Sequence, residues 1–132
     1  MLKTCKSCNE KLDISKFGVN NSKKDNLAVY CLSCCREAYT KRRIEAQTFI
    51  LDYLANNPCV QCGESDIRVL EFNHLRDKSF NIARRASKGA TKKLLIKEIE
   101  KCEVLCANCH RKHTCNQSNS MRVSYMKERG LL

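Results

Sequence analysis

The sequence predicts an α+β fold built of two small zinc-stabilised modules joined by a helix. The pattern Cys-x-x-Cys occurs four times, at Cys5–Cys8, Cys31–Cys34, Cys59–Cys62 and Cys106–Cys109. Residues 36–56 carry apolar side chains at helical spacing, and residues 69–74 alternate apolar and polar side chains as a strand does. Because 132 residues give each half only a marginal hydrophobic core, each half needs a further stabilising element such as a metal ion.

Zinc explains the eleven cysteines better than disulfide bonds do. Their number is odd, so at least one cannot pair within the chain, and the x-x spacing suits ligands of a single metal ion. The N-terminus has no apolar signal segment, and no apolar run is long enough to span a membrane. We therefore expect reduced thiols, two structural Zn²⁺ ions, a cytoplasmic location and no membrane partner.

The first predicted module, residues 1–36, holds a four-thiolate zinc site. Cys5, Cys8, Cys31 and Cys34 form two pairs that flank a polar loop, which is the ligand spacing of a tetrahedral site. Cys35 directly follows Cys34 and is an alternative fourth ligand, although the x-x spacing favours Cys34. Four thiolates leave no open coordination position, so this site is expected to be structural.

Residues 36 to about 56 are predicted to form one helix, and the connection between the two modules is assigned to residues 37–57. Helical spacing places apolar side chains on an inward face: Ile44, Leu51 and Leu54, with Phe49 and Ile50 beside them. No glycine or proline interrupts the stretch before residues 56–58 (Asn-Asn-Pro) end it. About 20 residues at 1.5 Å each give a helix roughly 30 Å long.

The net charge of +11 favours a polyanionic partner. Eight ligand thiolates and two Zn²⁺ ions together carry −4, which leaves +7 of the formal +11. Lys41, Arg42 and Arg43 form a basic cluster on the predicted connecting helix and suit phosphate contacts. A solvated helix face explains this cluster equally well. Charge alone makes nucleic acid the favoured partner of the whole chain.

The second predicted module, residues 58–118, has the order strand, insertion, strand, turn and helix. Its elements are a strand at 69–74, a mostly irregular stretch at 76–88, a helix at 91–101, a short strand at 104–105, a turn at 106–109 and a helix at 108–117. Leu94, Leu95 and Ile99 are the expected inward side chains of the first helix. The tail, residues 119–132, is polar and expected to be helical in part.

A second four-thiolate site is predicted within this module. Its ligands are Cys59, Cys62, Cys106 and Cys109, which bring together residues more than 40 positions apart. The metal would hold the helix after Cys109 against the strand that ends at His74. The remaining cysteines, Cys35, Cys102 and Cys115, are expected to be small buried apolar side chains.

Three motifs of this module resemble the HNH endonucleases, a branch of the ββα-metal nucleases with a treble-clef-like zinc site. They are Cys59-Val-Gln-Cys62-Gly63, Leu70-Glu-Phe-Asn-His74-Leu75 and, within residues 98–111, Cys106-Ala-Asn-Cys109-His110-Arg111. The resemblance covers about 55 to 60 residues, with the motifs in the expected order. The first module is similar to the zinc finger that precedes many phage HNH and endonuclease VII-like proteins. A bacterial or phage-infected host cell is therefore implied.

The resemblance implies that the protein cleaves DNA by hydrolysing phosphodiester bonds. It implies that His74 is the general base for the attacking water. By position, Asn73 and His110 would bind one catalytic divalent cation, Mg²⁺ in the first instance. Arg76 and Arg111 would contact phosphate, whereas His113 and Glu71 are assigned no chemical role.

Two departures from the family pattern bear on this activity. The commonest residue before the family's general base is aspartate, and this chain has Asn73, whose amide lacks the negative charge that Mg²⁺ favours. Mn²⁺ or Ni²⁺ is then expected to serve better. The family's middle asparagine has Lys101 and Cys102 in its neighbourhood here, and Asn108 is a weak substitute.

Two other classes of function compete with the nuclease. A catalytically inactive, zinc-stabilised nucleic-acid-binding protein would keep the nuclease scaffold, and Asn73 is the residue that favours it. A redox protein would use its Cys-x-x-Cys pairs as dithiols and would hold no tightly bound zinc.

Overall fold

The computed structural model describes all residues, 1–132, and confirms the predicted α+β class. The strands are β1 (Leu2–Thr4), β2 (Lys11–Asp13), β3 (Phe17–Val19), β4 (Leu27–Cys31), β5 (Leu70–His74) and β6 (Cys102–Cys106). The helices are α1 (Leu32–Ala55), α2 (Ile82–Ala86), α3 (Lys92–Ile99), α4 (Ala107–Gln117) and α5 (Met121–Glu128), with a short 3₁₀ turn at Ile14–Lys16. The strands form three separate two-stranded antiparallel sheets.

The N-terminal part of the chain is built of two hairpins around a very small core. β1 pairs with β2, and β3 pairs with β4 across a register shift between Phe17 and Val19. Only Cys5, Phe17 and Cys31 are buried in this core. Three buried residues do not supply the apolar burial of an ordinary domain, so this part of the fold depends on what its cysteines bind.

Helix α1 begins at Leu32, four residues before the sequence predicts, and ends at Ala55 close to the predicted end. The Cys31 side chain accepts a hydrogen bond from the Cys34 backbone N–H and caps the helix. The 24 residues extend about 36 Å.

The inward face of α1 differs from the predicted one. Ala46, Ile50 and Leu54 are buried at four-residue spacing, whereas Ile44 and Leu51 are exposed. The prediction was right for Ile50 and Leu54 and wrong for Ile44 and Leu51, because the apolar residues of this helix do not form one stripe. Ala46 and Ile50 pack against residues of α2 and α3, and this packing selects the buried face.

Strands β5 and β6 form the hairpin of the second part of the fold. Their register runs from Leu70 opposite Cys106 to His74 opposite Cys102. β6 is therefore longer than the predicted 104–105 strand, because its pairing with all of β5 satisfies the backbone of Cys102 and Glu103. α4 follows at once, so the predicted turn at 106–109 is the first turn of this helix, capped by Cys106.

Two helices lie between these strands where the sequence predicts one. α2 occupies part of the stretch expected to be irregular, and the Asn81 side chain caps it by accepting from the Arg84 N–H. α3 is capped by Thr91 and buries Leu95 and Ile99. Leu94 is exposed, contrary to the prediction, because neighbouring helical residues lie about 100° apart and cannot both face the core.

Two apolar clusters hold this second part together, and both include α1. One joins Leu54 to the β5–β6 hairpin and its cysteines, and the other joins Ala46 and Ile50 to α2 and α3. The rings of Tyr53 and Phe72 pack between the clusters, with centroids 5.8 Å apart. The C-terminal half of α1 is therefore core of the second part, and the helix is more than a connector.

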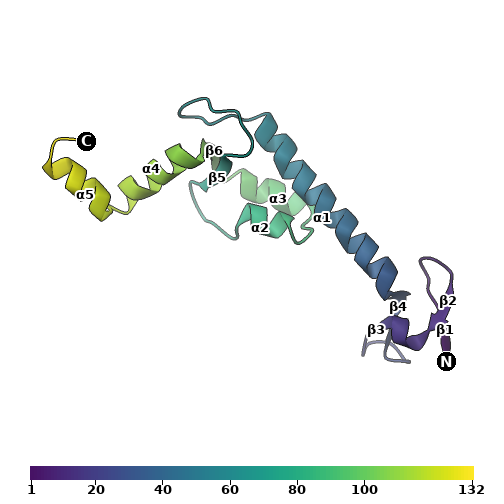
Figure 1. The fold of residues 1–132 in the computed structure, drawn as a ribbon. Helices are drawn as coiled ribbons and strands as arrows, with labels where there is room; N and C mark the ends of the chain where they lie inside the picture. Colours follow the sequence, from purple (N-terminus) through teal and green to yellow (C-terminus); the bar gives the residue numbers. More distant parts are fainter.

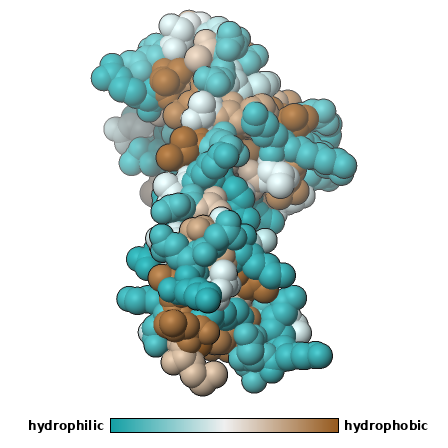
Figure 2. All heavy atoms as spheres, turned by 90° about the vertical axis from the view of Figure 1, so that its right-hand side faces the viewer, coloured by the Kyte–Doolittle hydropathy of each residue, from teal (hydrophilic) through white to brown (hydrophobic).

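The molecule is elongated (Figure 1). α1 carries the two N-terminal hairpins at one end and the β5–β6 hairpin with α2 and α3 at the other, and α4 and α5 continue away from them. Hydrophilic side chains cover most of the face drawn in Figure 2, with smaller hydrophobic patches between them. No helix combines the length and apolar character that a membrane crossing requires.

Candidate functional site

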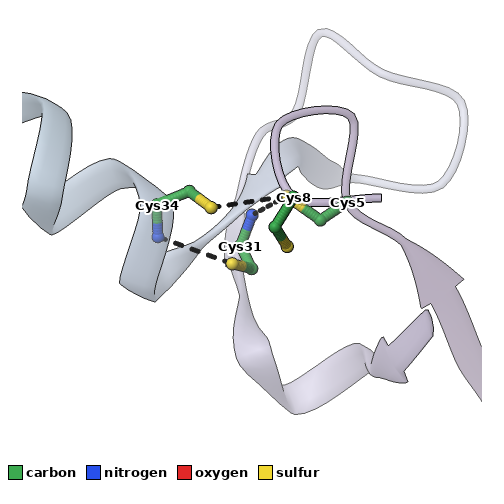
Figure 3. A group of neighbouring side chains, drawn as sticks. All are labelled: Cys5, Cys8, Cys31 and Cys34. Carbon is green, nitrogen blue, oxygen red and sulfur yellow. Dashed lines mark hydrogen bonds between the residues drawn. The ribbon is translucent and has the colours of Figure 1, made fainter. Parts of the chain in front are cut away.

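The first four-cysteine cluster lies where β1, β4 and the start of α1 meet (Figure 3). The sulfur atoms of Cys5, Cys8, Cys31 and Cys34 all lie within 4.8 Å of one another. The Cys5 and Cys34 Sγ atoms are 3.9 Å apart, and ligands of one tetrahedral zinc with Zn–S bonds of about 2.3 Å are separated by about 3.8 Å. The cluster can therefore hold a zinc ion.

The choice between Cys34 and Cys35 is decided by the first turn of α1. Cys34 joins the cluster, whereas the exposed Cys35 thiol lies 3.9 Å from the Tyr30 carbonyl oxygen. The expectation that Cys35 is buried was therefore wrong.

Backbone N–H groups stabilise a thiolate in the first cluster. N–H groups of Cys8, Cys31 and Ser7 lower the pKa of the Cys5 thiol to about 6 against the opposing effect of burial. The Cys5 thiolate is thus favoured at neutral pH without any metal.

The second four-cysteine cluster joins the loop at 59–62 to the start of α4. Its sulfur atoms also lie within 4.8 Å of one another, and the Sγ atoms of Cys62 and Cys106 are 3.6 Å apart. The Val60 N–H donates to the Val104 carbonyl at 3.0 Å and holds the loop on β6. Both predicted cysteine sets are therefore brought together, and each can hold zinc.

The thiols of the second cluster also have shifted pKa values. Burial acts to raise the pKa of Cys59, but backbone N–H groups of Cys106, Cys62 and Gln61 outweigh it and lower the value to about 6. The neighbouring Cys106 side chain is the main cause that raises the pKa of Cys109 to about 12. Four thiolates at this spacing repel one another unless a divalent cation lies between them.

Cys102 and Cys115 lie outside both clusters and are half-buried, so they are less buried than the sequence predicts. Burial raises the pKa of the Cys102 thiol to about 11, and its Sγ lies 3.4 Å from the Glu98 carbonyl oxygen. Such a thiol is protonated at neutral pH and is a poor nucleophile.

A groove of about 650 Å³ runs beside β5, between the end of α1, the start of α2 and α4. Asn73, His74 and His110 all line it, so the structure brings the three predicted active-site residues into one cavity. Lys78 lines it too, although the sequence did not single out this residue.

The predicted phosphate contacts lie elsewhere. Arg76 and Arg111 are exposed, form no ion pair and do not line the groove. Arg43 is seven residues before Ile50, the first α1 residue of the groove, which places the basic cluster about 10 Å further along the helix. Any polyanion that contacts all of them must therefore extend well beyond the groove.

His74 is held by a buried carboxylate. Its Nε2 lies 2.9 Å from Oε1 of Glu98, whose side chain is only 1% exposed. Glu98 also accepts from the Ser79 N–H at 2.7 Å and from Lys101 Nζ at 2.9 Å. Burial would raise the pKa of Glu98, but these hydrogen bonds, Lys101 foremost, bring it down to about 2.

The ionised Glu98 fixes the tautomer of His74. An ionised carboxylate has no proton to donate, so the proton in this hydrogen bond belongs to Nε2 of His74. In the neutral imidazole, Nδ1 then carries the free lone pair.

His110 has a carboxylate partner of its own. Its Nδ1 lies 2.6 Å from Oε2 of Glu71, and the two side chains are 29% and 50% exposed. His110 is on the first turn of α4 and Glu71 is on β5, so this contact joins the helix to the strand. The sequence assigned Glu71 no chemical role, and its contact with His110 was not predicted.

Asn73 is buried and makes one side-chain hydrogen bond. Its Nδ2 donates to Oε1 of Glu103, the residue opposite it on β6, at 3.1 Å. No hydrogen bond engages its Oδ1. The amide is thereby oriented with its nitrogen toward Glu103 and its oxygen free to bind another group.

Three carboxylates that contact the predicted site residues were not predicted, although the sequence pattern indicates the position of two of them. Glu98 falls between Leu95 and Ile99 on the inward stripe of α3, so periodicity places a charge in the core. Strand alternation places Glu71 on the same side of β5 as Asn73. The pairing of Glu103 with Asn73 depends on the β5–β6 register, which no sequence motif specifies.

Comparison with protein-family models, with curated proteins and with solved structures finds no match to this chain. The functional assignment therefore depends on the geometry of the groove and on the motifs of the sequence.

Proposed function

We propose that the protein is a metal-dependent DNA endonuclease of the HNH type, with both four-cysteine clusters occupied by structural zinc. The observation that carries this proposal is the groove, in which a histidine oriented by a buried carboxylate lies together with a second histidine and a free amide oxygen. The order of β5, β6 and α4 also agrees with a ββα-metal module.

His74 is the general base in this proposal. Glu98 keeps the proton on Nε2, which leaves Nδ1 to take the proton of an attacking water. The same hydrogen bond stabilises the imidazolium formed in that step, since its partner is a full negative charge. Glu98 is therefore a positioning residue, and His74 is the catalytic one.

The groove offers suitable donors for a catalytic divalent cation. Asn73 Oδ1 and an imidazole nitrogen of His110 are an oxygen and a nitrogen ligand of the kind that Mn²⁺, Ni²⁺ and Mg²⁺ accept. When bound, such a cation polarises the scissile phosphate and stabilises the leaving oxygen. Glu103 orients the Asn73 amide by accepting a hydrogen bond from its Nδ2, which turns the amide oxygen away from Glu103.

Positive charge supports DNA as the substrate. Lys78 lines the groove, and Arg76 and Arg111 are exposed and unpaired on the same module. Lys41, Arg42 and Arg43 on α1 extend the basic surface toward the N-terminal hairpins. Contacts of this kind are nonspecific, so DNA affinity falls steeply with salt.

A non-catalytic nucleic-acid-binding protein is the alternative. Asn73 favours it, because a neutral amide replaces the carboxylate that a hard cation prefers. A protein of this kind binds DNA with the same salt dependence but leaves the phosphodiester bond intact.

Plasmid nicking separates the two functions. The zinc-loaded protein is incubated with supercoiled DNA in Mg²⁺, Mn²⁺ or Ni²⁺, beside His74→Ala and the control His113→Ala, a half-exposed α4 histidine outside the groove lining. We expect nicking by the native and His113→Ala proteins, faster in Mn²⁺ or Ni²⁺, and none by His74→Ala. DNA binding without nicking in any of the three metals would establish the alternative instead.

A further inference from the structure

The contact between Glu71 and His110 joins β5 to α4 but adds little to the stability of the fold. Both side chains are partly exposed, and a hydrogen bond at such a site contributes little to stability. It does, however, place a carboxylate oxygen and an imidazole nitrogen 2.6 Å apart, and both residues line the groove. These are two ligand types that one divalent cation binds together.

Asn73 adds a third donor on the same side of β5. Residues two apart on a strand share a face, so Glu71 and Asn73 point to the side on which Glu71 meets α4. The Asn73 amide nitrogen donates a hydrogen bond to Glu103, and the Asn73 amide oxygen has no hydrogen-bond partner. An unused oxygen donor thus lines the same groove as the Glu71–His110 pair.

We propose that Glu71 is the anionic ligand of a divalent-cation site completed by Asn73 and His110. This inference rests on the proposed nuclease function and deepens it, because it names the group that supplies the negative charge that Asn73 lacks. Where aspartate is the commonest residue, this chain has the neutral Asn73, and the carboxylate of Glu71 restores the negative charge that a hard cation favours.

The observed separation fits this role. Two ligands bound at about 2.1 Å to one cation and at a right angle to each other lie about 3 Å apart. The Glu71 and His110 atoms are at 2.6 Å and need to open by only a few tenths of an ångström. Since Glu71 is half exposed, its rotation is not opposed by packing, and water can complete the coordination shell.

The alternative role for Glu71 is to orient His110 from outside the coordination shell. In that arrangement the carboxylate accepts the His110 Nδ1 proton, and Nε2 binds the cation. The substitution Glu71→Gln separates the two roles, because glutamine keeps an acceptor oxygen for Nδ1 but loses the charge. A ligand role predicts a large loss of cation affinity, and an orienting role predicts a small one.

The test measures Mn²⁺ binding to the zinc-loaded full chain by electron paramagnetic resonance of the free ion, without DNA. We expect one site in the native protein, an affinity at least about tenfold lower in Glu71→Gln, and a comparable loss in His110→Ala. The control Glu100→Gln removes an exposed carboxylate from the end of α3 and leaves the affinity unchanged. Zinc content and circular dichroism verify that each variant is folded.

Two outcomes overturn the proposal: an affinity of Glu71→Gln less than about tenfold below that of native protein, which is the result of an orienting role, and an absence of Mn²⁺ binding to the native chain. Nuclease failure is distinguishable from both. A native protein that binds Mn²⁺ through Glu71 but never nicks DNA supports the cation site and refutes the nuclease. A Glu71→Gln variant that nicks DNA as well as native protein, with no loss of Mn²⁺ affinity, refutes the site alone.

Discussion

At the scale of single residues, the buried Glu98 carboxylate determines how His74 is presented to the groove. It accepts hydrogen bonds from His74, Lys101 and the backbone of Ser79, and its exposed fraction is 1%. A charge buried to this extent is costly unless every acceptor position is used, so the network is held in one arrangement. The protein therefore uses a charged core residue to fix one tautomer of one histidine.

The variant Glu98→Gln tests this role. Glutamine keeps the size of the side chain but permits either tautomer, so nicking should fall about 10–100-fold. In ¹⁵N-detected NMR spectra, native His74 should show a protonated Nε2, and the variant should show a mixture of tautomers. Glu100→Gln, an exposed substitution two residues along, should change neither readout. A native spectrum with the proton on Nδ1 contradicts the assignment.

Asn73→Asp tests the proposed role of Asn73 as a cation ligand, and its contact with Glu103 requires a second substitution in the same protein. A carboxylate at this position supplies charge for Mg²⁺, but it loses the hydrogen bond to Glu103 and faces its negative charge instead. We expect Asn73→Asp combined with Glu103→Gln to raise the nicking rate in Mg²⁺ above that of native protein. Glu103→Gln alone is the control, and an unchanged Mg²⁺ rate in the double variant contradicts this account.

Residues with a motif were predictable from the sequence, and their partners were not. The spacing of the cysteines identified both clusters, and the histidine motifs identified the residues that share the groove. Glu71, Glu98 and Glu103 reach these residues across 39, 24 and 30 positions of the sequence. Such contacts depend on strand register and helix docking, which a local pattern does not encode.

At the scale of secondary-structure elements, the turn after α2 determines how closely α2 and α3 approach α1. Gly89 has a φ of +77°, and a Cβ atom built on it would lie 3.1 Å from the Arg42 Cβ. No other residue type combines this backbone conformation with so short an approach. The close packing of Ala46 and Ile50 against Ala86 and Leu95 depends on this turn.

Gly89→Ala is expected to lower the free energy of unfolding by about 2–3 kcal/mol, from left-handed backbone strain and the clash with α1. Gly63→Ala is the matched control, because Gly63 has the same φ of +77° and no atom within 4 Å of an added Cβ. Gly63→Ala should lower the free energy of unfolding by only about 1–2 kcal/mol. Urea denaturation of both zinc-loaded variants measures the difference, and equal losses would show that the approach of α1 is unimportant.

The elements that were predicted poorly are those whose limits depend on tertiary partners. The early start of α1 follows from capping by Cys31, a member of the first four-cysteine cluster, and the full length of β6 follows from its pairing with β5. α2 has only five residues, too few for helical periodicity to appear. The long helix and the strand ending at His74 were predictable because each has a pattern of its own.

At the scale of the whole molecule, two four-cysteine clusters accompany small apolar cores in place of the single large core that a chain of this length ordinarily has. The three buried apolar clusters hold seven, six and three residues, and the largest includes three cysteines of the second four-cysteine cluster, Cys59, Cys106 and Cys109. Structural zinc contributes roughly 10–16 kcal/mol of apparent binding free energy, comparable with the stability of a whole domain. Folding of each part is therefore expected to require its own zinc ion.

Serine substitutions of exposed ligands test this dependence without disturbing the core. Cys8→Ser and Cys62→Ser each remove one exposed thiol, from the first and second cluster respectively. The zinc content, measured by elemental analysis, should fall from two ions per chain to one in each case. Amide NMR signals should be lost for the N-terminal hairpins in Cys8→Ser and for the β5–β6 hairpin in Cys62→Ser.

Cys115→Ser is the control for these variants, because Cys115 lies outside both clusters and its substitution should leave two zinc ions in place. Native protein with no tightly bound zinc would contradict the zinc account and revive the redox interpretation of the Cys-x-x-Cys pairs.

The measurement that tests the central claim most directly is the single-turnover cleavage rate of an end-labelled DNA duplex in Mn²⁺. Native protein is compared with His74→Ala, both with full zinc content and equal DNA affinity. We predict a hydrolytic product from native protein and a rate at least about 100-fold lower in His74→Ala, the lower end of what a general base contributes. Native protein that binds the duplex but leaves it uncut, or two proteins with rates within about threefold of each other, would contradict the assignment of this groove as a nuclease active site.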